Sequence, residues 1–331
     1  MLELIAALIV LNFAIVMVGM PRLIVKLNKT GTVTIDRYKQ DLREVPTQGG
    51  IAIVAVVLLV FILATLFDHL PISASVPLQL SDVDWAILIV AGLFAAFGLV
   101  DDLVDVGRKA KLVLLFFLSY RLIFDISSTL VTIPFLGSFE FGVYYLLLIV
   151  PLYVMVVANL VNMHSGFNGL GSGLSAILLF FMLIKMVIAG SEGVFVLSGM
   201  LGATLGFLWY NRYPARVLEG NVGSLALGAT LGAVIVVSGF LVAGFVMLIP
   251  HTVNFLMYVY WRLMHRLYPE DERWRIVKFG KVRADGTLDV PNRLTLKWVL
   301  PSSVKMTEQQ AVLAMYALTI PFCVIGLLIP Y

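Results

Sequence analysis

The chain has 331 residues, of which 60% are hydrophobic and only 13% are charged, about half the charged share of ordinary soluble domains. This composition leaves too little polar surface for a water-soluble globule, so most of the chain is expected to lie in lipid. The net charge of +3 says little by itself, and we expect no nucleic-acid partner. The one cysteine, Cys323, excludes an intramolecular disulfide and a thiolate metal cluster.

In chain order, the sequence contains apolar segments long enough to be membrane helices, since about 20 apolar residues cross the hydrocarbon core. The first has no Lys or Arg before its apolar run and is interpreted as a helix rather than a cleaved signal peptide. We predict an all-α integral membrane protein of about ten transmembrane helices, in a single polytopic domain over residues 1–331. The predicted spans are 3–21, 49–68, 85–100, 111–128, 143–160, 173–190, 193–209, 222–237, 238–261 and 311–329.

The basic residues are concentrated in alternate connections between these segments. All 23 Lys and Arg residues except Arg121 and Lys185 lie there, whereas connections 69–84 and 129–142 and both termini have none. The positive-inside rule therefore predicts extracytoplasmic termini. Arg121 and Asp125, four residues apart, are expected to form a structural pair within a helix. The predicted cytoplasmic loops are about 22–48, 101–111, 159–173, 210–224 and 262–310.

Two adjacent acids, Asp101 and Asp102, end the third apolar segment, and Lys111 follows them. Adjacent carboxylates at a helix end are costly unless a cation neutralises them, and either a metal ion or a lysine can do so. The alternative interpretation is a pair of solvated acids that stop the helix.

The segment from Asn159 to Gly173 combines amides at three-residue spacing with several glycines. Amide side chains suit the edge of a nucleobase, and their carbonyl oxygens suit Mg²⁺. The alternative is packing of small polar residues between helices. His164, within this run, is interpreted as a hydrogen-bonded loop residue rather than a catalyst.

Two later cytoplasmic motifs are typical of phosphate binding. Residues Gly220 to Ser224 form a glycine-rich turn that opens a helix, although glycines also allow close helix packing. Arg273 and Arg275 flank Trp274, which suits bidentate diphosphate binding together with stacking. The alternative for this last motif is a basic loop lying on anionic lipid head groups.

The order and spacing of these motifs resemble the polyprenyl-phosphate N-acetylhexosamine-1-phosphate transferase family, and its archaeal and eukaryotic dolichyl-phosphate branch is the more similar. The resemblance covers most of the chain, through residues 46–50, the Asp101–Asp102 pair, residues 159–169 and residues 220–224. It implies ten helices. The extended final-loop insertion of eukaryotic members is missing, which favours an archaeal cell membrane, with the endoplasmic reticulum membrane as the location if the source is eukaryotic.

The resemblance implies transfer of GlcNAc-1-phosphate, or a related amino-sugar-1-phosphate, from a UDP-sugar to polyprenyl or dolichyl phosphate with release of UMP. This would be the first membrane step of lipid-linked glycan synthesis for protein N-glycosylation. A homodimer is expected because relatives are commonly dimers. The rival class is a membrane transporter of a phosphorylated or nucleotide-linked solute, but it predicts acids and amides in mid-span, whereas here they cluster at helix ends.

The resemblance also implies roles for individual residues. Asp101, Asp102 and Lys111 would be catalytic, and Asn162 and Asn221 would bind Mg²⁺, with Mn²⁺ as an alternative. The expected substrate-binding residues are Thr47, Asn159, Gly166, Asn168, Arg273, Trp274 and Arg275.

Two positions depart from the family pattern. Where this chain has Asn221 the family usually has Asp, which leaves open an active natural variant, a weakened metal site or an engineered inactivating change. Trp274 stands where relatives have a sugar-contacting His, so the identity of the amino sugar is left open.

Overall fold

The computed structural model describes residues 1–68, 80–104, 106–126 and 128–330 and is mainly helical. Three predicted segments lie partly outside the described residues: most of the connection 69–84, residue 105 of the loop 101–111, and residue 127 of the span 111–128. The helices are α1 (Leu2–Lys29), α2 (Ile51–Asp68), α3 (Asp82–Val104), α4 (Arg108–Leu118), η2 (Ser119–Phe124), η3 (Tyr145–Ile149), α5 (Val150–Met163), α6 (Leu170–Ala189), α7 (Val194–Asn211), α8 (Gly220–Val237), α9 (Leu241–Met247), α10 (Ile249–Leu267), η4 (Glu272–Trp274), α11 (Leu296–Val299) and α12 (Glu308–Leu328). Three antiparallel pairs are formed by β1 (Val33–Ile35) with β2 (Glu44–Pro46), β3 (Leu130–Ile133) with β4 (Gly137–Glu140), and β5 (Lys281–Val282) with β6 (Leu288–Asp289).

Seven helical segments of the described chain are long and apolar enough to cross a membrane: α1, α3, η3 with α5, α6, α7, α8 and α12. Helices α9 and α10 meet at a 67° bend and together could form an eighth span. All ten predicted spans coincide with helices, although α2, and α4 continued by η2, are not among these seven. The prediction of a helical, multi-pass membrane protein is confirmed, whereas the number of ten crossings stays a prediction. Arg121 does pair with Asp125.

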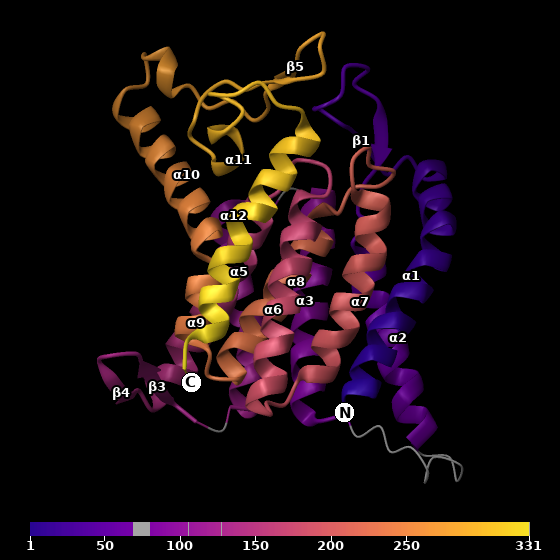
Figure 1. Cartoon of the computed structure of the whole chain (residues 1–331), viewed down its shortest axis with the longest axis vertical. Coiled ribbons are helices and arrows are strands. Elements are labelled where there is room, and N and C mark those ends of the chain that lie inside the picture. The colour runs from indigo at the N-terminus through magenta and orange to yellow at the C-terminus, as the bar shows by residue number, and fades with distance from the viewer. Residues whose placement is uncertain (69–79, 105, 127, 331) are drawn as a thin grey trace.

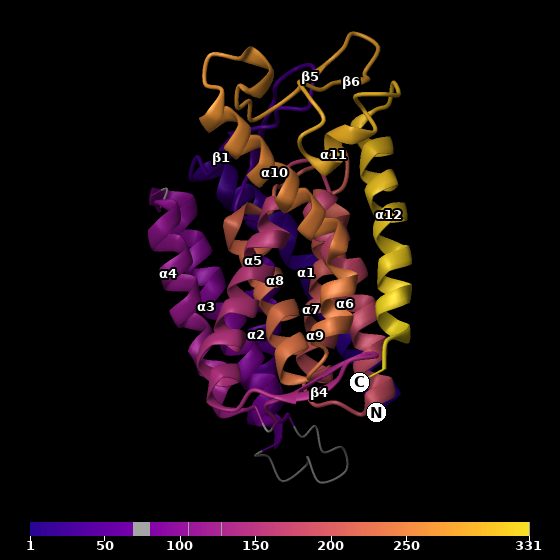
Figure 2. The same ribbon diagram turned by 90° about the vertical axis from the view of Figure 1, so that its left-hand side faces the viewer.

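The two ends of the helical bundle differ in structure. Both chain termini and the β3–β4 hairpin lie at one end, and β1, β5, α11 and the start of α12 lie at the other (Figures 1 and 2). The segments in which the basic residues are concentrated are at this second end, on the side opposite the termini. This is the arrangement that the charge pattern requires.

Helix α8 lies at the centre of the bundle. Every residue from Val222 to Val236 is buried, although the helix is apolar and could have faced lipid. Small residues allow its neighbours to approach closely. A Cβ atom added to Gly228 would lie 2.6 Å from the Cα atom of Ala158 in α5, and one added to Gly98 in α3 would lie 2.5 Å from the Asn221 carbonyl oxygen. Helix α8 is therefore fixed between α3 and α5, with its first turn beside the end of α3.

A second, smaller core covers the β1 end of the bundle. It is built around Tyr38, Phe167, Trp261 and Trp298, which come from four segments far apart in the sequence. The Tyr38 hydroxyl accepts a hydrogen bond from the Trp298 indole N–H at 3.2 Å. This core fixes the connection between β1 and β2 over the ends of the helices, where it forms part of a cavity wall.

Candidate active site

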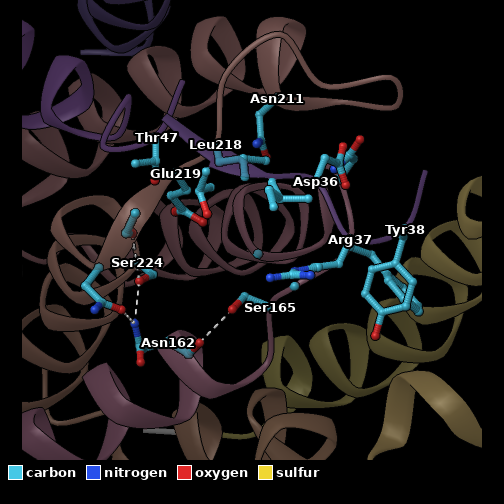
Figure 3. A pocket seen from close by; sticks show the side chains of 18 of the residues that line it. Asp36, Arg37, Tyr38, Thr47, Asn162, Ser165, Asn211, Leu218, Glu219 and Ser224 are labelled. Atoms are coloured by element: carbon cyan, nitrogen blue, oxygen red, sulfur yellow. Dashed lines mark hydrogen bonds between the residues drawn. The ribbon is translucent and has the colours of Figure 1, made fainter. Parts of the chain in front are cut away.

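A polar cavity of about 280 Å³ lies at the β1 end of the bundle, where the β1–β2 segment meets the connections before α6 and α8 (Figure 3). Its walls contain carboxylate, amide, hydroxyl and guanidinium groups rather than a continuous apolar surface. Of the residues predicted from the sequence, those that line it are Thr47, Asp102, Asn162, Gly166, Asn168 and Asn221.

The Asp101–Asp102 pair is neutralised in two different ways. Asp102 accepts hydrogen bonds from the backbone N–H groups of Asn221 (3.0 Å) and Val222 (3.3 Å). These N–H groups belong to the first turn of α8, which favours a negative charge. Asp101 forms an ion pair with the Lys111 ammonium at 2.9 Å. The predicted neutralisation by lysine is therefore present, and the N-terminus of α8 supplies the second neutralising group.

An amide network joins α5 to the start of α8. The Asn162 side-chain N–H₂ group donates to the Asn221 carbonyl oxygen Oδ1 at 2.8 Å and to the Ser224 hydroxyl at 2.7 Å. The Asn221 side-chain N–H₂ group in turn donates to Asp101 at 3.0 Å. The two predicted metal ligands thus lie next to each other, and Asn221 connects them to the Asp101–Lys111 pair.

The segment before α6 also contributes to the cavity wall. Asn168 is 4% exposed, and its Oδ1 atom accepts a hydrogen bond from the Ala215 N–H at 2.9 Å. Gly166 has a φ of +101°, a conformation that L side chains rarely adopt. Beside Gly166, the Lys297 ammonium donates a hydrogen bond to the Ser165 carbonyl oxygen at 2.6 Å. Burial lowers the pKa of Lys297 to about 8.

Four of the predicted substrate-binding residues do not line this cavity. Asn159 donates to the Met155 carbonyl within α5, at 2.8 Å. The side chain of Arg273 is 81% exposed and is paired with Asp271. Trp274 packs edge-to-face against Tyr260, and Arg275 is exposed. The structure therefore does not bring the Arg273–Arg275 motif to the other predicted residues.

Charged groups that were not predicted as site residues also line the cavity. The Arg37 side chain extends from the side of Tyr38 toward the middle of the cavity (Figure 3), and its guanidinium group lies 5.7 Å from the centre of the Phe279 ring. Glu219 lies on the opposite wall, near Thr47. Its Oε1 atom is buried without a hydrogen-bond partner among the described residues, and burial raises the pKa of Glu219 to about 8. An acid directly before the Gly220–Ser224 turn was the available signal for Glu219.

His164 is buried outside the cavity lining. Its ring lies edge-to-face against that of His251, with 4.6 Å between the ring centres. Burial places the pKa of His164 well below its usual value, so the imidazole is neutral at pH 7. The pairing with His251 was not visible in the sequence. The interpretation of His164 as a hydrogen-bonded residue is wrong, because neither of its ring nitrogens has a hydrogen-bond partner among the described residues. The expectation that His164 is not a catalyst stays a prediction.

The oxygen-rich wall suits a hard divalent cation. No group of three or more His, Cys, Asp or Glu side chains suited to a metal ion is found among the described residues. Among the oxygen donors that line the cavity are Asp102, Asn162, Asn221 and Ser224. Mg²⁺ commonly binds through one or two carboxylates together with substrate phosphates and water. The donor set therefore fits a Mg²⁺ ion whose charge is balanced largely by the substrate.

Comparison of the sequence with known proteins finds a family to which the chain is similar. Residues 85–239 match the model of glycosyl transferase family 4. This segment runs from α3 to the end of α8 and contains the acid pair, Lys111 and the amide network.

Similarity to individual relatives extends beyond this segment. "Putative UDP-N-acetylglucosamine--dolichyl-phosphate N-acetylglucosaminephosphotransferase" of Saccharolobus solfataricus is 30% identical over 315 residues, 91% of this chain and 89% of the relative. The protein of the same name from Sulfolobus acidocaldarius is 28% identical over 326 residues, 96% of this chain and 94% of the relative. A phospho-N-acetylmuramoyl-pentapeptide-transferase of Thermodesulfovibrio yellowstonii is 32% identical over 252 residues, 64% of this chain and 65% of the relative. The chain belongs to glycosyl transferase family 4.

Proposed function

We propose that this chain transfers GlcNAc-1-phosphate from UDP-GlcNAc to dolichyl or polyprenyl phosphate. An oxygen of the lipid phosphate would form a bond to the β-phosphorus of the nucleotide sugar. The bond from that phosphorus to the α–β bridging oxygen would break, and UMP would leave with the bridging oxygen. The names of the two archaeal relatives, which align with almost the whole chain, support this reaction over transport.

One observation carries the proposal: the acid pair, Lys111 and the Asn162–Asn221 pair form one connected network, and Asp102, Asn162 and Asn221 of this network line a single cavity. Phosphoryl transfer depends on positioning and on neutralising negative charge, and the protein needs to contribute little covalent chemistry. Lys111 supplies a fixed positive charge beside this wall. Asp101 holds that charge in place through the 2.9 Å ion pair.

The distribution of groups along the cavity suggests how a nucleotide sugar would lie in it. Asn168 and the Gly166 backbone would contact the uracil, as the family resemblance implies. Asp102, Asn162 and Asn221 line the same cavity, and the Arg37 side chain extends toward its middle (Figure 3). A diphosphate in the middle of the cavity would be within reach of this guanidinium group, which can form a bidentate hydrogen-bonded pair with a phosphate.

Asn162 and Asn221, with the Ser224 hydroxyl and Asp102 nearby, would hold Mg²⁺, with Mn²⁺ as an alternative. When bound, the cation would neutralise charge on the diphosphate and make the phosphorus a better electrophile. The chain's own residues would do the remaining work. Asp102 keeps the first turn of α8 in place, and the Asn162 side chain fixes the orientation of Asn221.

We also propose ten membrane crossings with extracytoplasmic termini, a place in an archaeal cell membrane, and a homodimer. The substrate cavity would then open to the cytoplasm, where nucleotide sugars are made, and the reaction would begin lipid-linked glycan synthesis for N-glycosylation. Cysteine labelling tests the orientation, because the native Cys323 is buried. A membrane-impermeant maleimide should label Glu140→Cys in intact cells and Asp285→Cys only after lysis. The opposite pattern would contradict the proposed orientation.

The decisive experiment measures UMP release by the purified protein with UDP-GlcNAc, polyprenyl phosphate and Mg²⁺, and repeats it with other UDP-amino sugars. Lys111→Ala and Asp102→Asn should each lower turnover at least about a hundredfold, because Lys111 supplies positive charge beside the reacting groups and Asp102 would help to hold the cation and the first turn of α8. Lys109→Ala is the matched control, since Lys109 is exposed on the same helix. Thermal unfolding of all three variants shows whether the fold persists. Absence of UMP release with every UDP-amino sugar would refute the transferase.

A further inference from the structure

A second cavity lies at the same end of the bundle, beside α7 and α12. Its volume is about 610 Å³, and its walls come from the end of α7, the connection from α7 to α8 and the start of α12. Three arginines line it, Arg43, Arg212 and Arg216, and its lining contains no Asp or Glu. The cavity is therefore strongly positive and separate from the polar cavity proposed for the reaction.

None of these arginines pairs with a carboxylate among the described residues. The guanidinium groups instead lie against rings and backbone carbonyls: that of Arg212 is 3.7 Å from the centre of the Trp209 ring, and that of Arg216 is 4.4 Å from the centre of the Tyr210 ring. The Nε atom of Arg43 is buried without a hydrogen-bond partner. Three arginines around one cavity repel each other unless an anion lies between them, and their N–H groups suit a phosphate.

The surroundings of the cavity favour a phosphate carried by a lipid. Trp209 and Tyr213 are 44% and 40% exposed, and such aromatic residues are enriched at the boundary between the hydrocarbon core and water. Leu313, also in the cavity wall, is 57% exposed on the flank of α12. An acyl chain could thus continue along the apolar helices while the head group stays among the arginines. A soluble anion would contact only the arginines of this cavity and not the apolar side chains.

The positive cavity shares one wall residue with the cavity proposed for the reaction, because Asn168 lines both. The Oδ1 atom of Asn168 accepts its hydrogen bond from the Ala215 N–H, directly beside Arg216 in the α7–α8 connection. Anything that fixes this connection fixes the orientation of the Asn168 side chain. We propose that Arg43, Arg212 and Arg216 bind the phosphate head group of an anionic membrane phospholipid, and that the bound lipid thereby tightens nucleotide-sugar binding at Asn168.

The lipid-binding part of this proposal is tested without enzymatic activity. The full chain is placed in nanodiscs of phosphatidylcholine alone or with phosphatidylglycerol, and the lipid that it retains is measured by native mass spectrometry. Arg212→Gln/Arg216→Gln should retain phosphatidylglycerol roughly tenfold to thirtyfold less well than the wild type, since each basic group near a membrane surface contributes to anionic lipid binding. The matched control is Arg262→Gln/Arg266→Gln, two exposed arginines with the same spacing on α10.

The coupling part rests on the proposed function and is read from the KM for UDP-GlcNAc. Phosphatidylglycerol should lower this KM several-fold in the wild type and in the α10 control, without a matching change in kcat, and should have no effect on Arg212→Gln/Arg216→Gln. Equal phosphatidylglycerol retention in both double variants would overturn the site. So would an equivalent effect of millimolar inorganic phosphate in phosphatidylcholine discs, which would identify a soluble anion instead. If no transferase activity is found, the retention measurement still decides the lipid site.

Discussion

The contact between α3 and α8 at Gly98 allows a sharp test of how the proposed active site is held together. A Cβ atom added at Gly98 would lie 2.5 Å from the Asn221 carbonyl oxygen and 2.7 Å from the Val222 nitrogen. Ordinary van der Waals contact begins at 3.4 Å. Gly98→Ala must therefore move the two helices apart by about 1 Å at this point, because the atoms in the way belong to backbone and cannot rotate aside.

This displacement falls on the hydrogen bonds that orient the acid pair. Asp102, one turn after Gly98, accepts from the Asn221 and Val222 N–H groups at 3.0 and 3.3 Å, and about 1 Å more would break both bonds. A misplacement of this size can cost about a hundredfold in rate. The overpacking itself should lower stability by about 1–3 kcal/mol. We therefore expect turnover to fall much further than thermal stability would suggest.

The same helix provides a matched control in Gly92, because a Cβ atom added there meets no heavy atom within 4 Å. Gly92→Ala should keep wild-type activity. UMP release and thermal unfolding of both variants in detergent would be compared under identical conditions. If Gly98→Ala kept activity within about threefold of Gly92→Ala, the close α3–α8 contact would not be what positions Asp102, and the reasoning would be refuted.

Three further outcomes follow from individual residues in and near the site. Arg37→Gln should raise the KM for UDP-GlcNAc about tenfold and Arg273→Gln less than threefold, because of these two arginines only Arg37 lines the cavity. If steady-state kinetics gave the larger effect for Arg273→Gln, the Arg273 motif would be the one that binds the diphosphate. Lys297, whose pKa is lowered to about 8 from 10.5, binds its proton less tightly in the folded chain than in the unfolded chain. Raising the pH from about 7.5 to 10.5 should therefore stabilise the wild type relative to Lys297→Met by up to about 3 kcal/mol. The same pH dependence of the melting temperature in both proteins would contradict this. Asn221→Asp should show a larger rise in Tm on addition of MgCl₂ than the wild type, by roughly 3 °C, and an equal rise would show that residue 221 does not contact the cation.

Much of the fold could be predicted because it depends on two features that can be read directly from the sequence: the length of apolar segments and the distribution of basic residues between them. Apolar length located helices at all ten predicted spans, and the placement of basic residues indicated which connections share an end of the bundle. The 67° bend between α9 and α10 was not predicted, because hydropathy measures the length of an apolar run and not its direction. The burial of α8 was not predicted either, because a helix facing lipid and a helix facing other helices have the same apolar composition.

The candidate site was predicted where its residues belong to recognisable motifs. The Asp101–Asp102 pair, Asn162 and Asn221 do come together. Arg37 could not be found in this way, because its place in the cavity depends on Tyr38 packing against Phe167 and Trp298 from distant parts of the chain. Long-range contacts of this kind leave no local pattern.

The network around Asn221 gives a physical reason for an amide at this position. In the structure the Asn221 side chain donates a hydrogen bond to Asp101 and accepts one from Asn162, and only a group with both a donor and an acceptor can do this. An ionised aspartate would accept from Asn162 but would repel Asp101, leaving Lys111 to neutralise two carboxylates. The amide thus favours a stable network before any cation or substrate binds, whereas a carboxylate would favour the cation-bound state. This difference predicts that Asn221 reduces cation affinity in the free protein, and that the diphosphate of the substrate supplies the negative charge needed to bind Mg²⁺ here.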